Sequence, residues 1–99
     1  MKEIISKLNK QFENRVRLGI MSVLMVNESI DFTALRELLE VTDGNLSSHL
    51  TALEKSKLIE VHKQFVGRKP NTTYRITKSG RNDFSEHLEY LAKLINNEK

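Results

Sequence analysis

The chain has 99 residues, 38% of them hydrophobic and 29% charged, which is typical of one folded domain spanning residues 1–99. It contains no Cys, which excludes disulfides, thiolate metal sites and thiol redox chemistry. No apolar run approaches the ~20 residues that cross a bilayer, and the start lacks the apolar core of a signal peptide. We therefore expect a cytoplasmic protein with no membrane partner.

The net charge of +3 conceals an asymmetry. Segment 61–82 contains no Asp or Glu but holds Lys63, Arg68, Lys69, Arg75, Lys78 and Arg81. A solvated basic surface is the ordinary interpretation. A gap this long favours a polyanionic partner, because binding would release the counterions of its phosphates.

The first part of the chain predicts two helices. A short amphipathic helix is indicated by Ile4, Ile5 and Leu8. From Phe12 to Val26 the sequence is apolar almost throughout, which predicts a helix buried on most sides at the centre of the fold.

The next helix is predicted from Phe32 to Glu40. Asp31 is a good N-cap for it, and Ile30 and Leu35 are placed to form a hydrophobic staple. Its inner face is predicted to be Leu35, Leu38 and Leu39.

Another helix, the third when counted from the central one, follows after only a few residues, with Thr42 as its N-cap, and ends near Ser56 and Lys57. Its inner stripe is Leu46, Leu50 and Leu53. Its outer face is small, neutral and able to hydrogen-bond, with Lys55 as its only charge, where most surface helices carry Glu, Lys and Gln. The short connection between the two helices predicts a helix-turn-helix.

The remaining residues predict a hairpin and a helix. Ile59, Val61 and Phe65 alternate as one face of a strand, and a second strand runs from Thr72 to Thr77. The intervening GRKPN predicts a turn built from Gly67, Pro70 and Asn71. Thr77 caps a last helix with the stripe Phe84, Leu88, Leu91 and Ile95. The fold class is therefore mainly α with a small β-hairpin: a winged helix-turn-helix in the order helix, helix, helix, hairpin, helix, with terminal dimerisation helices.

From about Arg15 onwards the sequence resembles the short bacterial and archaeal winged-helix transcriptional regulators related to the MarR and ArsR groups. The resemblance is carried by RLGIMSVL, DFTALRELLEVTDGNLSSHLTALEKSKLIEV and FVGRKPNTTYRITKSGR. The chain departs from the family at Ser56-Lys57, where its members usually have a glycine before the apolar pair.

The outer face of the third helix fits a DNA major groove about 12 Å wide, because small side chains allow the backbone to approach. Asn45 matches the hydrogen-bonding edge of adenine, and no arginine is present for guanine. Specificity is then modest or partly read through DNA shape. The predicted base-reading residues are Gly44, Asn45, Ser47, Ser48, Thr51 and Ala52. The alternative is that this face packs on a helix of another protein.

The hairpin and its neighbours supply predicted backbone contacts. Arg68 and Lys69 at the tip suit the adjacent minor groove or its phosphates. The other backbone candidates are Thr42, Lys55, Lys63, Arg75 and Lys78. Arg15 and Arg17 either add such contacts or pair with Glu37 or Glu40.

Nothing in the sequence predicts catalysis, a metal or a cofactor. His49, His62 and His87 lie on three different elements, and no spacing matches a nucleophile set, a helical His pair or a phosphate-binding glycine loop. We expect His49, at the edge of the leucine stripe, to be a partly buried and hydrogen-bonded histidine.

Surplus apolar surface at the two ends predicts a homodimer. Segments 1–26 and 78–99 are expected to contribute dimerisation helices, through Ile4, Ile5, Leu8, Leu88, Leu91, Leu94 and Ile95. The alternative is that both helices fold back onto the same monomer.

The sequence thus predicts a homodimeric regulator of transcription that binds specific double-stranded DNA and is not an enzyme. The alternatives are a winged-helix protein-interaction module and a nonspecific nucleic-acid binder. No pattern in the sequence identifies the operator, the regulated genes or a small-molecule effector.

Overall fold

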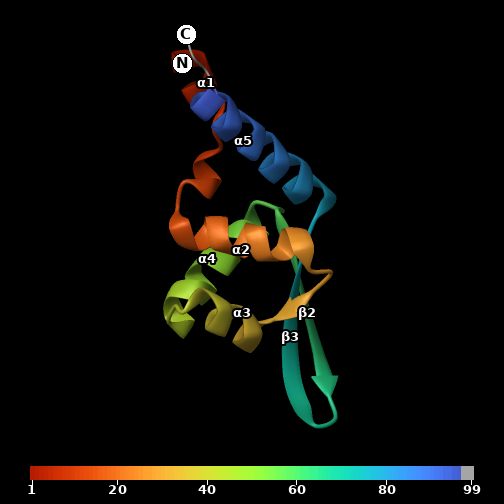
Figure 1. Ribbon diagram of the computed structural model, residues 1–99. Helices are drawn as coiled ribbons and strands as arrows, with labels where there is room; N and C mark the ends of the chain where they lie inside the picture. The colour runs from red at the N-terminus through yellow and green to blue at the C-terminus, as the bar shows by residue number, and fades with distance from the viewer. Residues whose placement is uncertain (97–99) are drawn as a thin grey trace.

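The computed structural model describes residues 1–96 and has the predicted order of elements, with two short additions (Figure 1). The elements are α1 (Lys2–Lys7), η1 (Lys10–Phe12), α2 (Arg15–Val26), β1 (Ile30–Asp31), α3 (Phe32–Leu39), α4 (Asp43–Lys55), β2 (Ile59–Val66), β3 (Lys69–Ile76) and α5 (Lys78–Asn96). The winged helix-turn-helix is therefore confirmed.

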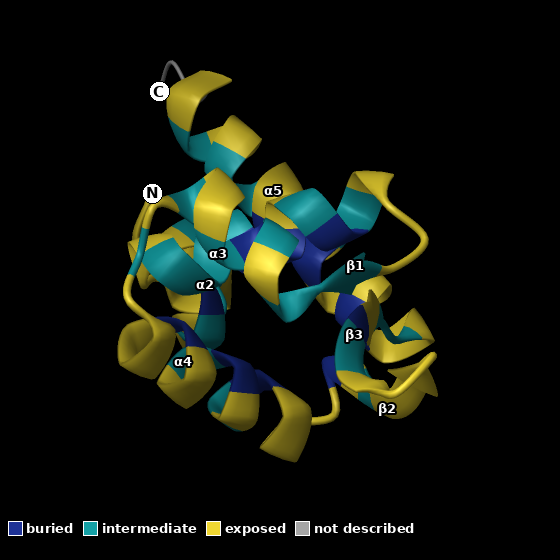
Figure 2. Ribbon diagram, turned by 90° about the horizontal axis from the view of Figure 1, so that it is seen from below, coloured by how far each residue is buried: buried dark blue, intermediate teal, exposed yellow. Residues whose placement is uncertain are grey.

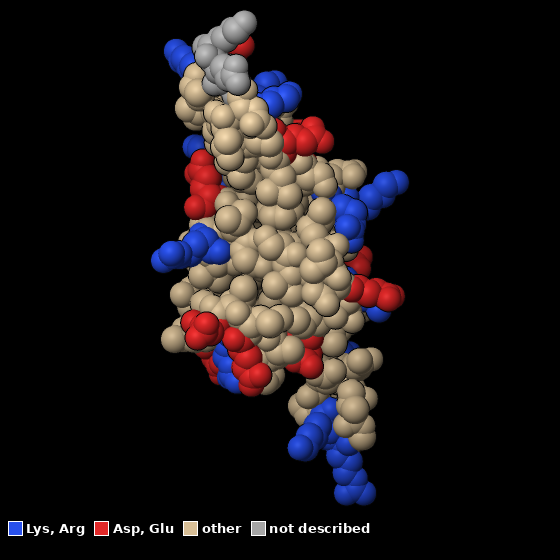
Figure 3. All heavy atoms as spheres, in the orientation of Figure 1, with Lys and Arg blue, Asp and Glu red and all other residues tan. Residues whose placement is uncertain are grey.

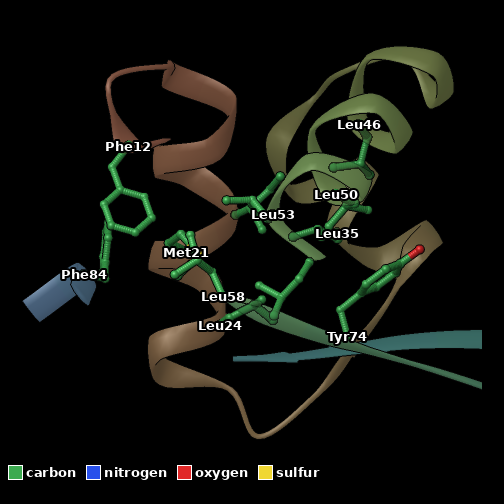
Figure 4. Packing of buried hydrophobic residues seen from close by; sticks show 12 residues of the cluster. Phe12, Met21, Leu24, Leu35, Leu46, Leu50, Leu53, Leu58, Tyr74 and Phe84 are labelled. Carbon is green, nitrogen blue, oxygen red and sulfur yellow. The ribbon is translucent and has the colours of Figure 1, made fainter. Parts of the chain in front are cut away.

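Helix α2 lies at the centre, as predicted, and packs against α3, α4 and β3. Side chains from these elements meet in one apolar cluster (Figure 4). Its fully enclosed members include Ile20, Met21, Leu24, Leu35, Leu46 and Leu53. The leucine stripe of α4 is buried as expected, and that leaves the opposite face of α4 exposed.

Polar caps start the helices where the sequence places them. A side-chain oxygen of Asp31 accepts from the Ala34 amide at 2.8 Å, and Thr42 Oγ1 accepts from the Asn45 amide at 3.1 Å. Thr77 Oγ1 accepts from the Gly80 amide at 2.9 Å at the start of α5. Each cap satisfies an amide that has no partner within its own helix.

The predicted start of the central helix at Phe12 is wrong. The side-chain oxygen of Asn14 caps α2 by accepting from the amides of Val16 and Arg17, so the helix begins at Arg15. Phe12 lies in η1 instead, and its ring packs edge-on against Phe84, 5.1 Å between centroids. Apolar residues lie on both sides of Asn14, so their pattern alone does not show that the helix begins only at this cap.

Two apolar side chains expected inside are outside. Leu38 of α3 is 62% exposed, and only Leu35 and Leu39 of its predicted inner face reach the core. Val26 ends α2 and is 82% exposed. Leu38 is on the exposed side of α3, although its neighbour Leu39 reaches the core, and Val26 is the last residue of α2.

The sheet has three strands in the order β1-β3-β2, and β1 was not predicted. Ile30 and Asp31 pair with Tyr74 and Thr73, so the residues that precede α3 also hold β3 in place. This pairing joins segments more than forty residues apart, which periodicity along the chain does not reveal.

The hairpin turn is tighter than predicted. Only Gly67 and Arg68 connect the strands, because Val66 already pairs with Lys69 and Phe65 with Pro70. Gly67 has φ +67°, as the first central residue of a type II′ turn requires. Pro70 and Asn71 therefore belong to β3, in the part of this strand that pairs with β2 alone. Pro is accommodated on such an edge.

The turn from α4 to β2 is sharp despite the missing glycine. Lys57 takes the left-handed conformation, φ 60°, and the Leu58 amide donates to the Leu53 carbonyl at 3.0 Å. The chain therefore makes this turn with a lysine in a conformation that favours glycine.

The molecule is elongated, with extents of 59 × 25 × 21 Å. The hairpin extends from one end, and α1 lies beside the distal part of α5 at the other (Figure 1). None of the helices described within residues 1–96 is long and apolar enough to cross a bilayer.

Candidate nucleic-acid interface

The outward face of α4 forms a shallow hollow of about 470 Å³. Its lining consists of Gly44, Ser47, Ser48, Thr51, Ala52 and Lys55, so the structure brings together five of the six predicted base-reading residues and Lys55. Asn45 is exposed on the same helix but is not part of this lining. Figure 2 shows the helix from below, buried along one side and exposed along the other.

Two of the polar side chains in this region already have intramolecular partners. Thr51 Oγ1 donates to the Ser47 carbonyl at 2.9 Å, so its hydroxyl is left as an acceptor. Thr42 Oγ1 is engaged in capping the helix. Within residues 1–96 the hydroxyls of Ser47 and Ser48 make no hydrogen bond, and they are free to donate or accept.

The first turn of α4 carries an acidic residue whose charge is balanced. Arg36 Nη1 of α3 lies 2.7 Å from Asp43 Oδ1, and this hydrogen bond and its charge raise the pKa of Arg36. A carboxylate also interacts favourably with a helix N-terminus. The pair fixes α3 to α4 across the turn and reduces the repulsion that Asp43 would exert on a phosphate.

A second hollow, of about 170 Å³, separates α4 from the hairpin. It shares Ser47 and Thr51 with the first hollow, and Lys63 of β2 lies on its other wall. The outer face of α4 thus continues directly onto the hairpin. Predicted residues from two elements meet at this cleft.

The cleft also contains a carboxylate that sequence reasoning missed. Glu54 lines it together with Tyr74, whose pKa is raised by burial and then by the charge of Glu54. Residues 47, 51 and 54 follow helical spacing, so the period that defined the outer face could have identified Glu54.

Only part of the predicted basic set gathers near the hairpin tip. Lys or Arg side chains project from its outer end, where no acidic atoms are visible (Figure 3), and Arg68 and Lys69 occupy these positions in the sequence. Arg75 neighbours Tyr74 on β3 and therefore lies on the face turned away from α4. Lys78 opens α5 at the opposite end of the hairpin. Arg81 donates to the Met25 carbonyl at 3.3 Å, near the end of α2.

Arg17 does not pair with Glu37 or Glu40. Its Nε donates to His49 Nδ1 at 2.9 Å, and its Nη1 donates to Gln11 Oε1 at 2.6 Å. Burial and then the Arg17 charge lower the pKa of His49. The expectation of a partly buried, hydrogen-bonded His49 is confirmed. The cluster joins η1, α2 and α4 and so fixes the position of α4.

The predicted dimer residues divide into two groups. Ile4, Leu8, Leu91 and Leu94 are half-buried where α1 packs on α5, whereas Ile5, Leu88 and Ile95 are exposed. Phe84 is enclosed by its own monomer against Phe12 and His87. The terminal helices are thus partly covered within one chain.

Across residues 1–96 no three His, Asp or Glu side chains converge as metal ligands would. The available chemistry is that of hydroxyls, amides and cations on an exposed surface, which can hydrogen-bond base edges and phosphates.

Comparison with known proteins agrees with this geometry. A family model described as a winged helix DNA-binding domain matches residues 16–95. An uncharacterized protein of Methanocaldococcus jannaschii is 34% identical over 88 residues, 89% of this chain and 96% of that protein.

Solved structures of other proteins share this fold. A transcriptional regulator homologue from Pyrococcus horikoshii OT3 is 32% identical and superimposes with a TM-score of 0.86, covering 97% of this chain and 93% of the other. A putative transcriptional regulator from Salmonella typhimurium, 24% identical, shares the fold with a TM-score of 0.73 over 88% of this chain and 76% of that one. The resemblance seen in the sequence is confirmed: the chain belongs to the winged helix DNA-binding domain family and is related to transcriptional regulators.

Proposed function

We propose that the protein is a transcriptional regulator that binds specific double-stranded DNA as a homodimer. Helix α4 lies in the major groove, and the hairpin contacts the adjacent minor groove or backbone. The observation that carries the proposal is the continuity of the hollow on α4 with the cleft beneath the basic hairpin, through Ser47 and Thr51. The resemblance of the Pyrococcus horikoshii regulator homologue over nearly the whole chain supports it.

The hydrogen-bonding state of each side chain predicts its role in the groove. The Thr51 hydroxyl, which already donates to a carbonyl, accepts from an amino group of adenine or cytosine. Asn45 is exposed and suits the paired acceptor and donor of adenine. Gly44 and Ala52 permit the close approach that these short side chains require.

The dimer rests on apolar surface that the monomer leaves uncovered. Ile5, Leu88 and Ile95 are exposed at the end of the molecule formed by α1 and α5, and Ile95 is 83% exposed. The radius of gyration of 15.1 Å exceeds the roughly 13 Å of a compact chain of this length, because this end and the hairpin extend beyond the core. To read an inverted repeat, the twofold dimer must hold its two α4 helices about 34 Å apart, which is one turn of DNA.

The dimer is tested by sedimentation of Ile95→Glu beside Val26→Glu. Both side chains are exposed, at 83% and 82%, but only Ile95 lies on α1 or α5, whereas Val26 ends the central helix α2. We expect a dimeric wild type, a monomeric Ile95→Glu and an unaffected Val26→Glu. A monomeric wild type of 11.5 kDa at micromolar concentration would exclude the dimer.

The experiment that tests DNA binding is selection from random duplexes followed by salt titration of the best sequence. We expect an enriched inverted repeat, and an affinity that falls steeply with salt as phosphate contacts are screened. Asn45→Ala and Ser48→Ala should each cost roughly 1–3 kcal/mol at the base they read and change the enriched sequence. If no sequence is enriched and the affinity depends only on salt, the protein is a nonspecific binder. No duplex binding at all would favour a protein-interaction module.

A further inference from the structure

The end of the hairpin combines apolar and basic residues. Phe65 is 74% exposed, although an aromatic side chain is usually placed in a core, and Pro70 opposite it is exposed as well. Arg68 and Lys69 lie between them along the chain. Folding of the monomer does not account for Phe65, because the core ends near the base of the hairpin.

The pairing register shows which way Phe65 faces. Residues 61, 63 and 65 of β2 share one face with their partners Tyr74, Thr72 and Pro70 of β3. This face is turned towards α4 at its base, because Val61, Lys63 and Tyr74 line the cleft with Ser47 and Thr51. Phe65 and Pro70 thus extend the α4-facing side of the hairpin beyond the end of that cleft.

Phe65 and Pro70 also occupy neighbouring positions. Val66 and Lys69 flank a two-residue turn, and such a pair exchanges hydrogen bonds. The next pair, Phe65 and Pro70, is then a non-hydrogen-bonded pair. In such pairs the two side chains lie closer together.

We infer that Phe65 and Pro70 form an apolar contact with the sugars and base edges of the DNA minor groove, while Arg68 and Lys69 hold the flanking phosphates. The inference rests on the proposed function and adds a second, uncharged contact to it. The adjacent basic residues Arg68, in the turn, and Lys69, directly after it, favour a polyanion over an apolar protein partner. A duplex on the outer face of α4 would meet the same side of the hairpin one groove further along.

The dimensions of DNA explain why an apolar residue suits this position. The minor groove is about 6 Å wide, too narrow for a whole two-stranded ribbon, so only side chains near the tip can enter. Proteins that insert apolar side chains there widen the groove and partly unstack a base step. Contact through Phe65 therefore adds affinity that does not depend on counterion release.

The first test compares Phe65→Thr with Val66→Thr. Both residues are exposed and adjacent on β2, but they lie on opposite faces, and Thr keeps the strand propensity. We expect Phe65→Thr to weaken binding to duplex DNA by roughly tenfold with an unchanged salt slope, because an apolar contact is lost. Val66→Thr should bind like the wild type. Arg68→Ala with Lys69→Ala should instead flatten the slope by about one unit per lost phosphate contact.

The second test uses fluorescence. The chain contains no Trp, so Phe65→Trp introduces a single reporter, and Val66→Trp is its matched control. We expect duplex DNA to quench the fluorescence of the Phe65→Trp variant and to protect its Trp from quenching by acrylamide. The Trp of the Val66→Trp variant should stay accessible to acrylamide.

The outcomes separate this inference from the proposed function. If the wild type binds duplexes and Phe65→Thr binds equally well, the wing contact is excluded and DNA binding by α4 stands. If the wild type binds no duplex, the proposed function itself fails. Burial of the Phe65→Trp reporter with rising protein concentration, in the absence of DNA, would assign the tip to self-association and overturn the inference.

Discussion

Gly80, in the first turn of α5, packs directly on the backbone of Leu58: a Cβ added to Gly80 would lie 2.0 Å from the Leu58 carbonyl oxygen. The same oxygen accepts from the amide of Thr77 at 3.1 Å. The residue that precedes β2 and the start of α5 are therefore joined through backbone, and only glycine allows the approach.

Gly80→Ala should consequently destabilise the protein strongly. The methyl group would collide with a carbonyl, which cannot rotate away as a side chain can, so we expect a loss of about 3 kcal/mol or more. The free energy of unfolding in urea measures it. An unfolding midpoint within error of the wild type would show that α5 can shift without cost.

Gly44→Ala is the matched substitution at a position where a methyl group has room. No atom lies within 4 Å of a Cβ at Gly44, and Ala is favoured over Gly within a helix, so we expect a gain of roughly 0.5–1 kcal/mol in stability. DNA binding should weaken, because the methyl group projects from the face proposed to enter the groove. Unchanged affinity for the selected duplex would place Gly44 away from the DNA.

Lys57→Gly should stabilise the fold. The left-handed conformation at Lys57, φ 60°, costs a non-glycine residue about 1–2 kcal/mol. Glycine removes that cost but makes the unfolded chain more flexible by about 0.4–1 kcal/mol. The net expectation is a gain of roughly 0.5–1 kcal/mol, measured by urea unfolding. Lys57→Ala, which keeps the strained conformation, serves as control and should show no comparable gain.

Stability should fall as the solution is acidified. His87 Nδ1 accepts from the Asn9 amide at 3.0 Å, and burial lowers the pKa of His87, as it does that of His49. A lowered pKa in the folded state means that the unfolded chain binds protons first. The stabilisation is therefore complete above about pH 6.5 and is lost progressively as the pH falls below that value towards the folded-state pKa values.

Urea unfolding between about pH 8 and about pH 5 measures this dependence. His87→Gln should reduce it, whereas His62→Gln, at an exposed position on β2, should leave it unchanged. Equal pH dependence in wild type and His87→Gln would show that His87 does not contribute.

Glu54→Gln should strengthen DNA binding. Its carboxylate lines the cleft opposite Lys63, which is predicted to contact a phosphate, and the amide of Gln removes the repulsion while keeping the shape. We expect a gain of a few fold at low salt that shrinks as salt rises. Lys63→Gln is the counterpart and should weaken binding. A gain that is independent of salt would contradict an electrostatic cause.

Much of the fold was predictable because its causes are local. Caps such as Asp31, Thr42 and Thr77 act on amides within three residues, and the leucine stripe of α4 follows the helical period. The small outer face of that helix could be recognised in the same way. These features depend on neighbours along the chain, and the sequence displays them directly.

Tertiary structure decided what depends on distant partners. Leu38 and Phe65 continue apolar patterns but find no element to cover them, and periodicity does not show where a core ends. Arg17 binds His49 rather than an acidic side chain, since the packing of α2 on α4 brings the two together. Likewise, the cleft that joins α4 to the hairpin exists only because the pairing of β2 with β3 places Lys63 and Tyr74 beside the α4 residues Ser47 and Thr51.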